Sequence, residues 1–232
     1  CRLRRQRQMC IRDRLIRGLI LLTANISFFY SISVISLPKA LTLAFVAPLV
    51  VTAFSPFFLG ESVGYRRWAA VIIGFIGSLV VIRPGFLEIN LASLAALGTG
   101  IMYGFYLIIT RKLSTSDNPL LTLLLTGVVG AIIATTFMPF VWVSPTFNQW
   151  SIMAAIGLFA CIGHLFIILS LKFADASKLA PFGYFEIVTN IIIAYYFFGD
   201  FPDSWTFLGL FIIVFSGIYI SRRENIVKNI KI

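Results

Sequence analysis

A single carboxylate lies deep inside an apolar run of this chain. Glu186 stands within the run Leu179 to Phe198, and Asn190, four residues later, shares its helical face. Gly183 lies one turn earlier on that face and would let a ligand or another helix approach. An ionised group at the centre of a membrane helix costs about 3 kcal/mol, so its presence there needs a reason. Glu186 can contact a cationic or amino-bearing substrate or carry a proton; alternatively, it is a protonated side chain hydrogen-bonded to a neighbouring helix.

The chain has one histidine, His164, in the middle of another apolar run. Gly157, Cys161, His164 and Ile168 form one stripe at helical spacing. An imidazole titrates near neutral pH, so it can carry protons or bind an anion. A lone histidine on such a stripe is more often a hydrogen-bonding bridge between helices, and both interpretations stay open.

Two other helical faces combine a polar group with aromatic rings. Asn25 shares a face with the phenylalanines that follow it, and Tyr103 lies between Gly100 and Gly104. A cavity with aromatic walls and a few polar groups suits a metabolite of medium size. Tyr103 also fits a helix interface. The candidate substrate-binding residues are therefore Glu186, Asn190, Gly183, Tyr103, His164 and Asn25.

These residues require membrane helices to position them. Apolar residues make up 59% of the chain and charged residues 12%, against about 25% charged in ordinary soluble domains. The apolar residues come in blocks of roughly 20, the length that crosses a hydrocarbon core of about 30 Å as a helix. The eight predicted spans are Gly18–Ser36, Ala40–Leu59, Trp68–Ile82, Leu91–Thr110, Leu120–Trp142, Ser151–Leu171, Leu179–Phe198 and Thr206–Ser221. We therefore predict an all-α polytopic membrane bundle.

Small residues and prolines within the spans predict how the helices pack and bend. Glycine pairs at helical spacing favour close helix contacts. Three such pairs are Gly74 with Gly77, Gly100 with Gly104, and Gly127 with Gly130. Pro48, Pro56 and Pro181 interrupt helices, because a proline removes one backbone hydrogen bond and bends the helix.

The net charge of +10 follows the membrane topology. With the C-terminus placed in the cytoplasm, 17 of the 19 basic residues fall on cytoplasmic segments, leaving only Lys39 and Arg83 outside. This is the positive-inside asymmetry of a multi-pass protein in a cell inner membrane. A nucleic-acid partner is disfavoured, because the charges lie on alternate short loops rather than on one face.

One part of the chain repeats another at an offset of 139 residues. Gly60-Glu61 follows one apolar run and Gly199-Asp200 follows another, and the same offset aligns Lys39 with Lys178. The loop after Gly60 carries two arginines and falls inside, whereas the loop after Gly199 carries none and falls outside. The two related parts are therefore predicted to cross the membrane in opposite orientations, as in carriers built from inverted repeats.

The repeat predicts the domain organisation. Residues 1–17 form a basic segment, residues 18–86 an incomplete first repeat with three helices, residues 91–221 a second repeat with five, and residues 222–232 a cytoplasmic tail. A first repeat of equal length would need two more helices. We therefore expect a fragment with eight of ten helices, in which residues 1–14 have an unusual composition.

Two motifs resemble those of a known family. The run Leu43 to Leu49 ending in Leu59-Gly60-Glu61, and the run Ala180 to Tyr184 ending in Phe198-Gly199-Asp200, are similar to helices of EamA-type transporters in the drug/metabolite transporter superfamily. Asp200 stands where the family usually has Glu. The resemblance implies ten helices in two inverted five-helix repeats with cytoplasmic termini. The surroundings of Pro181 and Tyr184 are similar to carriers of S-adenosylmethionine or amino-acid-like metabolites.

We thus expect a secondary transporter that moves a small organic metabolite across the lipid bilayer by alternating access. A lipid or drug flippase on the same scaffold is the alternative, and an integral membrane transferase is less favoured, because no paired carboxylates or metal-ligand clusters stand at helical spacing. Three cysteines form no pairing pattern, and no cofactor or metal is expected. Proton coupling and a homodimer stay open.

Overall fold

The structure, a computed structural model, describes residues 2–60, 63–82, 90–113, 118–173, 186 and 189–230. Across these ranges every regular element is a helix. Six helices are long and apolar enough to cross a membrane. The prediction of an all-α polytopic membrane protein is confirmed.

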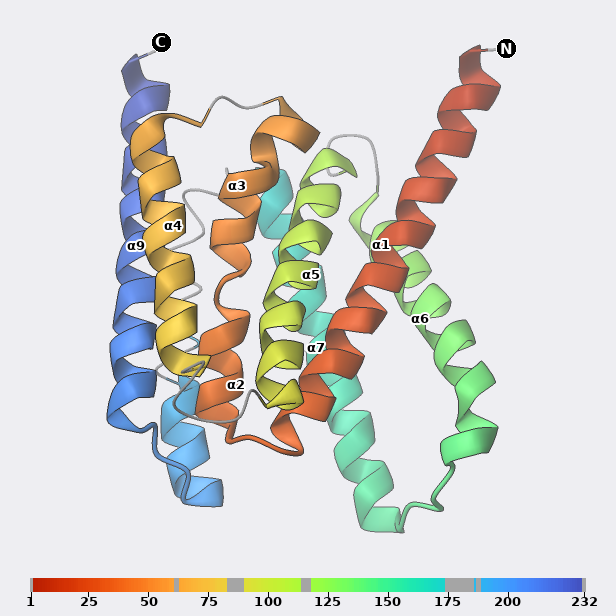
Figure 1. The fold of residues 1–232 in the computed structure, drawn as a ribbon. Coiled ribbons are helices and arrows are strands. Elements are labelled where there is room, and N and C mark those ends of the chain that lie inside the picture. The colour runs from red at the N-terminus through yellow and green to blue at the C-terminus, as the bar shows by residue number, and fades with distance from the viewer. Residues whose placement is uncertain are drawn as a thin grey trace. The chain divides into compact units, whose positions relative to one another are not determined.

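Most helices follow the predicted spans closely (Figure 1), whereas the part of the predicted span Leu179–Phe198 before Thr189 lies, apart from Glu186, outside the described residues. Their bounds are α1 Arg2–Ile32, α2 Leu37–Ala44, α3 Ala47–Leu59, α4 Tyr65–Ile82, α5 Leu91–Leu113, α6 Pro119–Val141, α7 Phe147–Phe173, the short helix Thr189–Phe198, and α9 Ser204–Ile230. Two helices are longer than expected: α1 includes most of the basic N-terminal segment, and α9 continues through the predicted tail to Ile230.

The chain divides into two compact units, each described here by itself. The first holds residues 1–22 and 109–174, and contains the start of α1 and the end of α5 together with α6 and α7. The second holds residues 23–108 and 175–232, and contains the rest of α1, α2 to α4, α5 up to Ile108, the helix Thr189–Phe198 and α9.

The second predicted span is broken into α2 and α3. Phe45 and Val46 separate the two helices, and Pro48 occupies the first turn of α3. This position suits proline, because the backbone N–H that proline lacks would have no partner in the first turn. The predicted bend at Pro48 is therefore a two-residue interruption within one membrane span, Leu37–Leu59. It leaves the Ala44 carbonyl close to Gly100 of α5, where a Cβ would lie 2.6 Å from that oxygen.

Two glycines at the predicted offset end their helices in the same way. Gly60 ends α3 and Gly199 ends the helix Thr189–Phe198, and both have φ of 68°. This left-handed conformation favours glycine, because a Cβ would crowd the backbone. The two helix ends point in opposite directions, α3 ending at the top of Figure 1 and Thr189–Phe198 at the bottom. The backbone here has the opposite orientations that the inverted repeat predicts.

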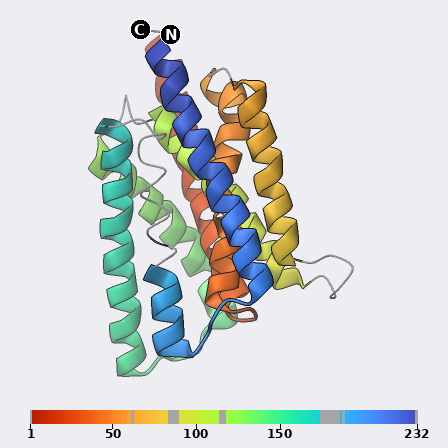
Figure 2. The same cartoon turned by 90° about the vertical axis from the view of Figure 1, so that its left-hand side faces the viewer.

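The same offset of 139 residues aligns the sequence of α4 with that of α9, so that Tyr65 at the start of α4 corresponds to Ser204 at the start of α9. These two helices lie side by side and run antiparallel (Figures 1 and 2). Gly77 and Gly209 meet where they cross: a Cβ on Gly209 would lie 2.3 Å from Val81 and 2.7 Å from the Gly77 carbonyl oxygen. Lipid tails are as apolar as leucine, so such close backbone contact, rather than escape from water, stabilises the pair.

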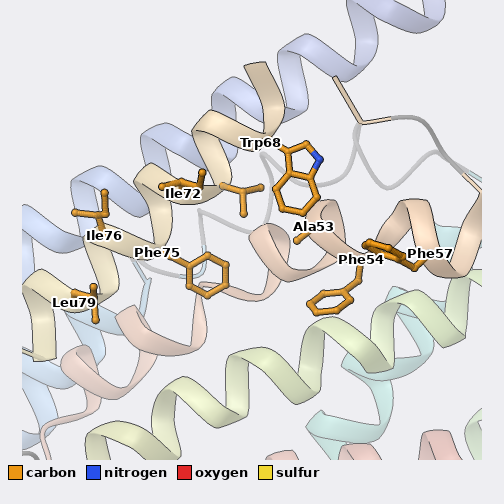
Figure 3. Close-up of a pocket in the computed structure, with 9 residues that line it drawn as sticks. Ala53, Phe54, Phe57, Trp68, Ile72, Phe75, Ile76 and Leu79 are labelled. Atoms are coloured by element: carbon orange, nitrogen blue, oxygen red, sulfur yellow. The ribbon is translucent and has the colours of Figure 1, made fainter. Parts of the chain in front are cut away.

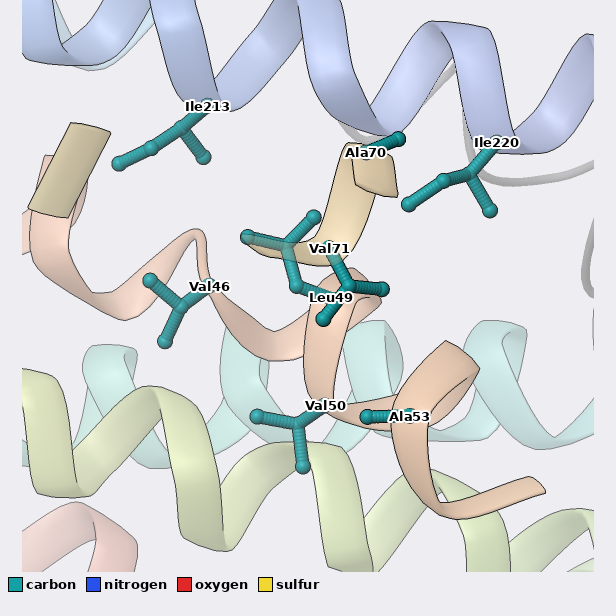
Figure 4. Packing of buried hydrophobic residues seen from close by; sticks show 8 residues of the cluster. All are labelled: Val46, Leu49, Val50, Ala53, Ala70, Val71, Ile213 and Ile220. Carbon is teal, nitrogen blue, oxygen red and sulfur yellow. The ribbon is translucent and has the colours of Figure 1, made fainter. Parts of the chain in front are cut away.

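A buried apolar cluster joins this helix pair to α3 (Figure 4). Its members come from the α2–α3 region, α4 and α9, and are Val46, Leu49, Val50, Ala53, Ala70, Val71, Ile213 and Ile220. Gly104 of α5 packs on Val50, where a Cβ would approach to 2.8 Å. The predicted seams at Gly74 with Gly77 and at Gly100 with Gly104 are thus confirmed.

The third predicted seam, at Gly127 with Gly130, has no packing partner among the described residues. A Cβ on Gly127 or Gly130 of α6 meets no atom of the described residues within 4 Å. Helices α6 and α7 contact each other, and Trp142 and Trp150 at their connection lie 6.3 Å apart between ring centroids. Most side chains of both helices are exposed.

Candidate functional site

The structure brings three of the predicted site residues together in the second unit. Glu186 is helical and exposed, and its side chain forms a hydrogen bond with Asn190. Tyr103 of α5 lies close enough to Glu186 to interact with it electrostatically. A carboxylate, an amide and a phenol from distant parts of the chain therefore share one region. The exposed carboxylate is accessible to a ligand.

A second tyrosine extends this region. The rings of Tyr103 and Tyr106 stack with 5.6 Å between centroids and an angle of 21°. Tyr106 is only 1% exposed, whereas Tyr103 is half-buried. The buried ring therefore fixes the position of its more accessible neighbour. A stacked aromatic pair near a carboxylate can bind a flat ring or a cation.

Asn25 is exposed and belongs to the same unit. It directly follows Ala24, whose carbonyl oxygen accepts a hydrogen bond of 3.3 Å from Thr99 Oγ1 on α5. Asn25 therefore stands where α1 packs against the helix that carries Tyr103. Gly183 lies outside the described residues, as does Pro181.

His164 belongs to the first unit, in α7, and is half-buried. It interacts electrostatically with Arg17 of α1. Arg17 is fully buried, and its Nη2 donates hydrogen bonds to the Thr122 carbonyl oxygen and to Thr126 Oγ1, both on α6. The histidine thus lies near a buried cation rather than among apolar side chains alone.

Arg17 has no role in the sequence-based prediction, which placed it at the end of the basic segment. The spacing of residues in α1 could nevertheless have identified Arg17 as a packed residue. Arg17, Leu21, Ala24 and Ser31 are all buried, and they follow one another at helical spacing of three, four or seven residues. Arg17 therefore continues the packed face of α1 by one more turn.

Among the described residues, no three His, Cys, Asp or Glu side chains are grouped as a metal site would need. Cys161 of α7 is a free, exposed thiol. The side chains of the site can bind a ligand reversibly, through charge, hydrogen bonds and aromatic rings.

The helix lengths and apolar faces define a polytopic helical membrane protein. The model of the EamA-like transporter family matches residues 5–83 and 90–222. The chain belongs to this family of membrane transporters.

Known relatives are carriers of small molecules. The S-adenosylmethionine uptake transporter of Rickettsia bellii is 26% identical over 211 residues, which cover 91% of this chain and 72% of the relative. The riboflavin transporter of Vibrio cholerae is 30% identical over 193 residues, which cover 81% of this chain and 63% of the relative. A protein of known crystal structure is similar in fold, with a TM-score of 0.65 at 18% identity, covering 92% of this chain and 78% of the other.

Proposed function

We propose that this protein is a secondary carrier that moves a small organic metabolite across the membrane by alternating access, with an amino-acid-like or S-adenosylmethionine-like substrate. Family membership and the substrates named for its relatives support this class. The observation that carries the proposal is the grouping of Glu186, Asn190 and Tyr103 in one unit.

Each of these groups has a distinct part in binding. The Glu186 carboxylate binds a positively charged amino or sulfonium group, because opposite charges attract strongly away from bulk water. Asn190 holds the carboxylate by its hydrogen bond. The stacked rings of Tyr103 and Tyr106 contact a planar or cationic part of the substrate.

The remaining predicted residues complete the proposal. Asn25 supplies a polar contact from α1 and Gly183 leaves room for the ligand. His164, beside Arg17, binds an anionic group or takes part in proton coupling. We place the protein in a bacterial inner membrane with a cytoplasmic C-terminus, and we propose transport without catalysis.

Uptake by proteoliposomes tests the carrier proposal. The purified protein is reconstituted and offered a panel of radiolabelled amino acids, S-adenosylmethionine and riboflavin. We expect accumulation of a substrate with a cationic group, and at least a tenfold loss of uptake for Glu186→Gln, because one charge-assisted contact is worth about 1.5–3 kcal/mol.

Asp200→Asn is the matched control. Asp200 is the next acidic residue along the chain, and its backbone N–H closes the helix end by bonding to the Ala194 carbonyl oxygen at 3.2 Å. Since that bond is made by the backbone, uptake by Asp200→Asn should stay at the wild-type level. Equal uptake by wild type and Glu186→Gln for every transported compound would remove the carboxylate from the binding site.

Proton coupling is tested separately with an imposed pH gradient. We expect the gradient to drive substrate accumulation by the wild type, and Glu186→Gln to retain only exchange that does not depend on the gradient. A gradient response that survives in Glu186→Gln but disappears in His164→Gln would assign the proton to the histidine instead.

A further inference from the structure

A hydrogen bond joins two helices beside the candidate site. The open groove between α3 and α4 has a volume of about 470 Å³, but its lining is apolar and aromatic, so it lacks the polar contacts of a metabolite site (Figure 3). The polar contact lies instead between α1 and α5, where Thr99 Oγ1 is 3.3 Å from the Ala24 carbonyl oxygen. Both residues belong to the second unit and are buried.

The Thr99 hydroxyl has a second acceptor within its own helix. Its oxygen lies 3.0 Å from the carbonyl oxygen of Ala95, one turn earlier in α5. A hydroxyl has one proton to donate, so the two carbonyl oxygens share it. A buried donor that loses its acceptor is destabilising, but the Thr99 hydroxyl keeps Ala95 when the contact with Ala24 is lost. The contact between the helices can therefore break and form again at little cost in hydrogen bonding.

This contact lies between an apolar contact and the candidate site. Phe28, one turn after Ala24, packs against the buried cluster to which Ala96 of α5 belongs. Tyr103 follows Thr99 by one turn of α5, and since α1 and α5 run antiparallel, it lies on the other side of the contact (Figure 1).

The contact also lies next to the second polar residue of the site. Asn25 directly follows Ala24 and is exposed. The separation of Asn25 and Tyr103 is therefore set by how closely α1 approaches α5 at Thr99.

We propose that Thr99 is a positioning residue of the carrier site. This inference rests on the proposed function, in which Asn25 and Tyr103 contact the substrate. When the hydroxyl donates to Ala24, α1 is held against α5 and the two site residues stay at the separation that binding requires. When it donates to Ala95 alone, α1 moves away from α5 and the site opens. A carrier that alternates between two states needs contacts that exchange in this way.

Chemical labelling tests the positioning role without any substrate. The three native cysteines are replaced by Ala, Asn25→Cys is introduced, and the full chain is reconstituted in liposomes. The rate of reaction with N-ethylmaleimide then reports how accessible this position is. We expect Thr99→Val, which removes the hydroxyl and keeps the shape of the side chain, to raise the rate about threefold or more, the factor that one net hydrogen bond provides. Thr99→Ser should restore the original rate.

Thr42→Val is the matched control. Thr42 is also buried in the second unit, and its hydroxyl donates to the Pro38 carbonyl oxygen of its own helix at 2.8 Å. Its loss should leave the labelling rate unchanged. Equal rates with and without Thr99→Val would overturn the proposal. So would an equal increase in both threonine variants, which would mean a general loosening of the unit.

Uptake of S-adenosylmethionine by proteoliposomes tests whether Thr99 acts through Asn25. We expect Thr99→Val to raise KM about threefold while the maximal rate stays near that of the wild type. In an Asn25→Ala background the same change should leave KM where Asn25→Ala alone puts it. Effects on KM that multiply would contradict the proposal. If no offered compound is transported, the carrier function fails, whereas the labelling rates still decide the role of Thr99.

Discussion

Two helix pairs of this protein pack in different ways. In the pair of α4 and α9, Gly77 and Gly209 bring the two backbones together, and α4 alone buries eight side chains or glycines. In the pair of α6 and α7, a Cβ on Gly127 or Gly130 meets no atom of the described residues within 4 Å, and within this part of the chain the buried residues of the pair are Thr122, Thr126 and Ile168.

The difference shows that a glycine pair contributes to packing only when a second helix presents small residues or a surface of complementary shape. Gly209 stands opposite Gly77 on α9, whereas no residue of the described chain approaches Gly127. In lipid, apolar side chains gain little by leaving the bilayer for another helix, so contact depends on fit. The α6–α7 pair is instead connected to α1 by the polar contacts of Arg17.

The largest effect is expected from Gly209→Leu. The added Cβ would lie 2.3 Å from Val81 Cγ2 and 2.7 Å from the Gly77 carbonyl oxygen, so the two helices must separate. Overpacking commonly costs 1–3 kcal/mol, and contact with backbone leaves little room for adjustment, so we expect a loss of about 3 kcal/mol or more. Fluorescence-detected size-exclusion chromatography after heating measures the loss of folded protein. Gly127→Leu on α6 should keep the wild-type melting temperature. If Gly127→Leu and Gly209→Leu lose the same amount of folded protein, the α4–α9 and α6–α7 pairs do not differ in packing as we infer.

Gly100→Ala should have a smaller effect of about 1–3 kcal/mol, because only one methyl group is added. Its Cβ would lie 2.6 Å from the Ala44 carbonyl oxygen, at the break between α2 and α3. Gly98→Ala, two residues earlier in α5, meets nothing within 4 Å and should gain about 0.5–1 kcal/mol from helix propensity. The free energy of unfolding in mixed detergent micelles distinguishes the two. If Gly98→Ala is as destabilising as Gly100→Ala, the loss of stability comes from a change in the geometry of α5 rather than from contact with the Ala44 carbonyl oxygen.

Much of the fold could be predicted from the sequence. Apolar blocks of roughly membrane thickness fixed the positions of the spans, because run length alone identifies them. The helical parts beyond them, residues 2–17 and 222–230, carry no such signal, because charged residues form helices without being apolar. The break at Phe45 and Val46 was expected only as a bend. How far the helix is interrupted at these two residues depends on how α5 packs against them, and this contact between distant segments has no pattern in the sequence.

The candidate site was predictable only in part. Glu186 and Asn190 share a helical face, so their proximity follows from spacing. The proximity of Tyr103 does not, because it depends on how distant helices meet. Arg17 was missed because it immediately precedes the apolar block and resembles the basic residues before it, although its register continues the buried face of α1.

Removing one hydrogen bond of Arg17 should have a moderate effect. Thr126→Val deletes an acceptor of Nη2 and should lower the free energy of unfolding by about 1.5–3 kcal/mol, the usual range for a hydrogen bond to a charged group. In an Arg17→Met background the same change should have less than half that effect, which a double-mutant cycle measures. Thr135→Val is the control, because its hydroxyl bonds only to the Ala131 carbonyl oxygen on an exposed part of α6. Additive effects of Thr126→Val and Arg17→Met would show that the two side chains are not coupled.

The smallest effect is expected from Phe159→Ala on α7. Phe159 is 71% exposed, and lipid chains replace the lost ring contacts, so stability should change by less than about 0.5 kcal/mol. Val81→Ala on α4 removes fewer atoms but should cost about 1 kcal/mol or more, because Val81 is fully buried against Gly209 and leaves a void. Unfolding in mixed micelles would rank the two. A large loss for Phe159→Ala would mean that another protein surface covers α7 in solution, and the contrast between the helix pairs would then reflect a missing neighbour rather than different packing.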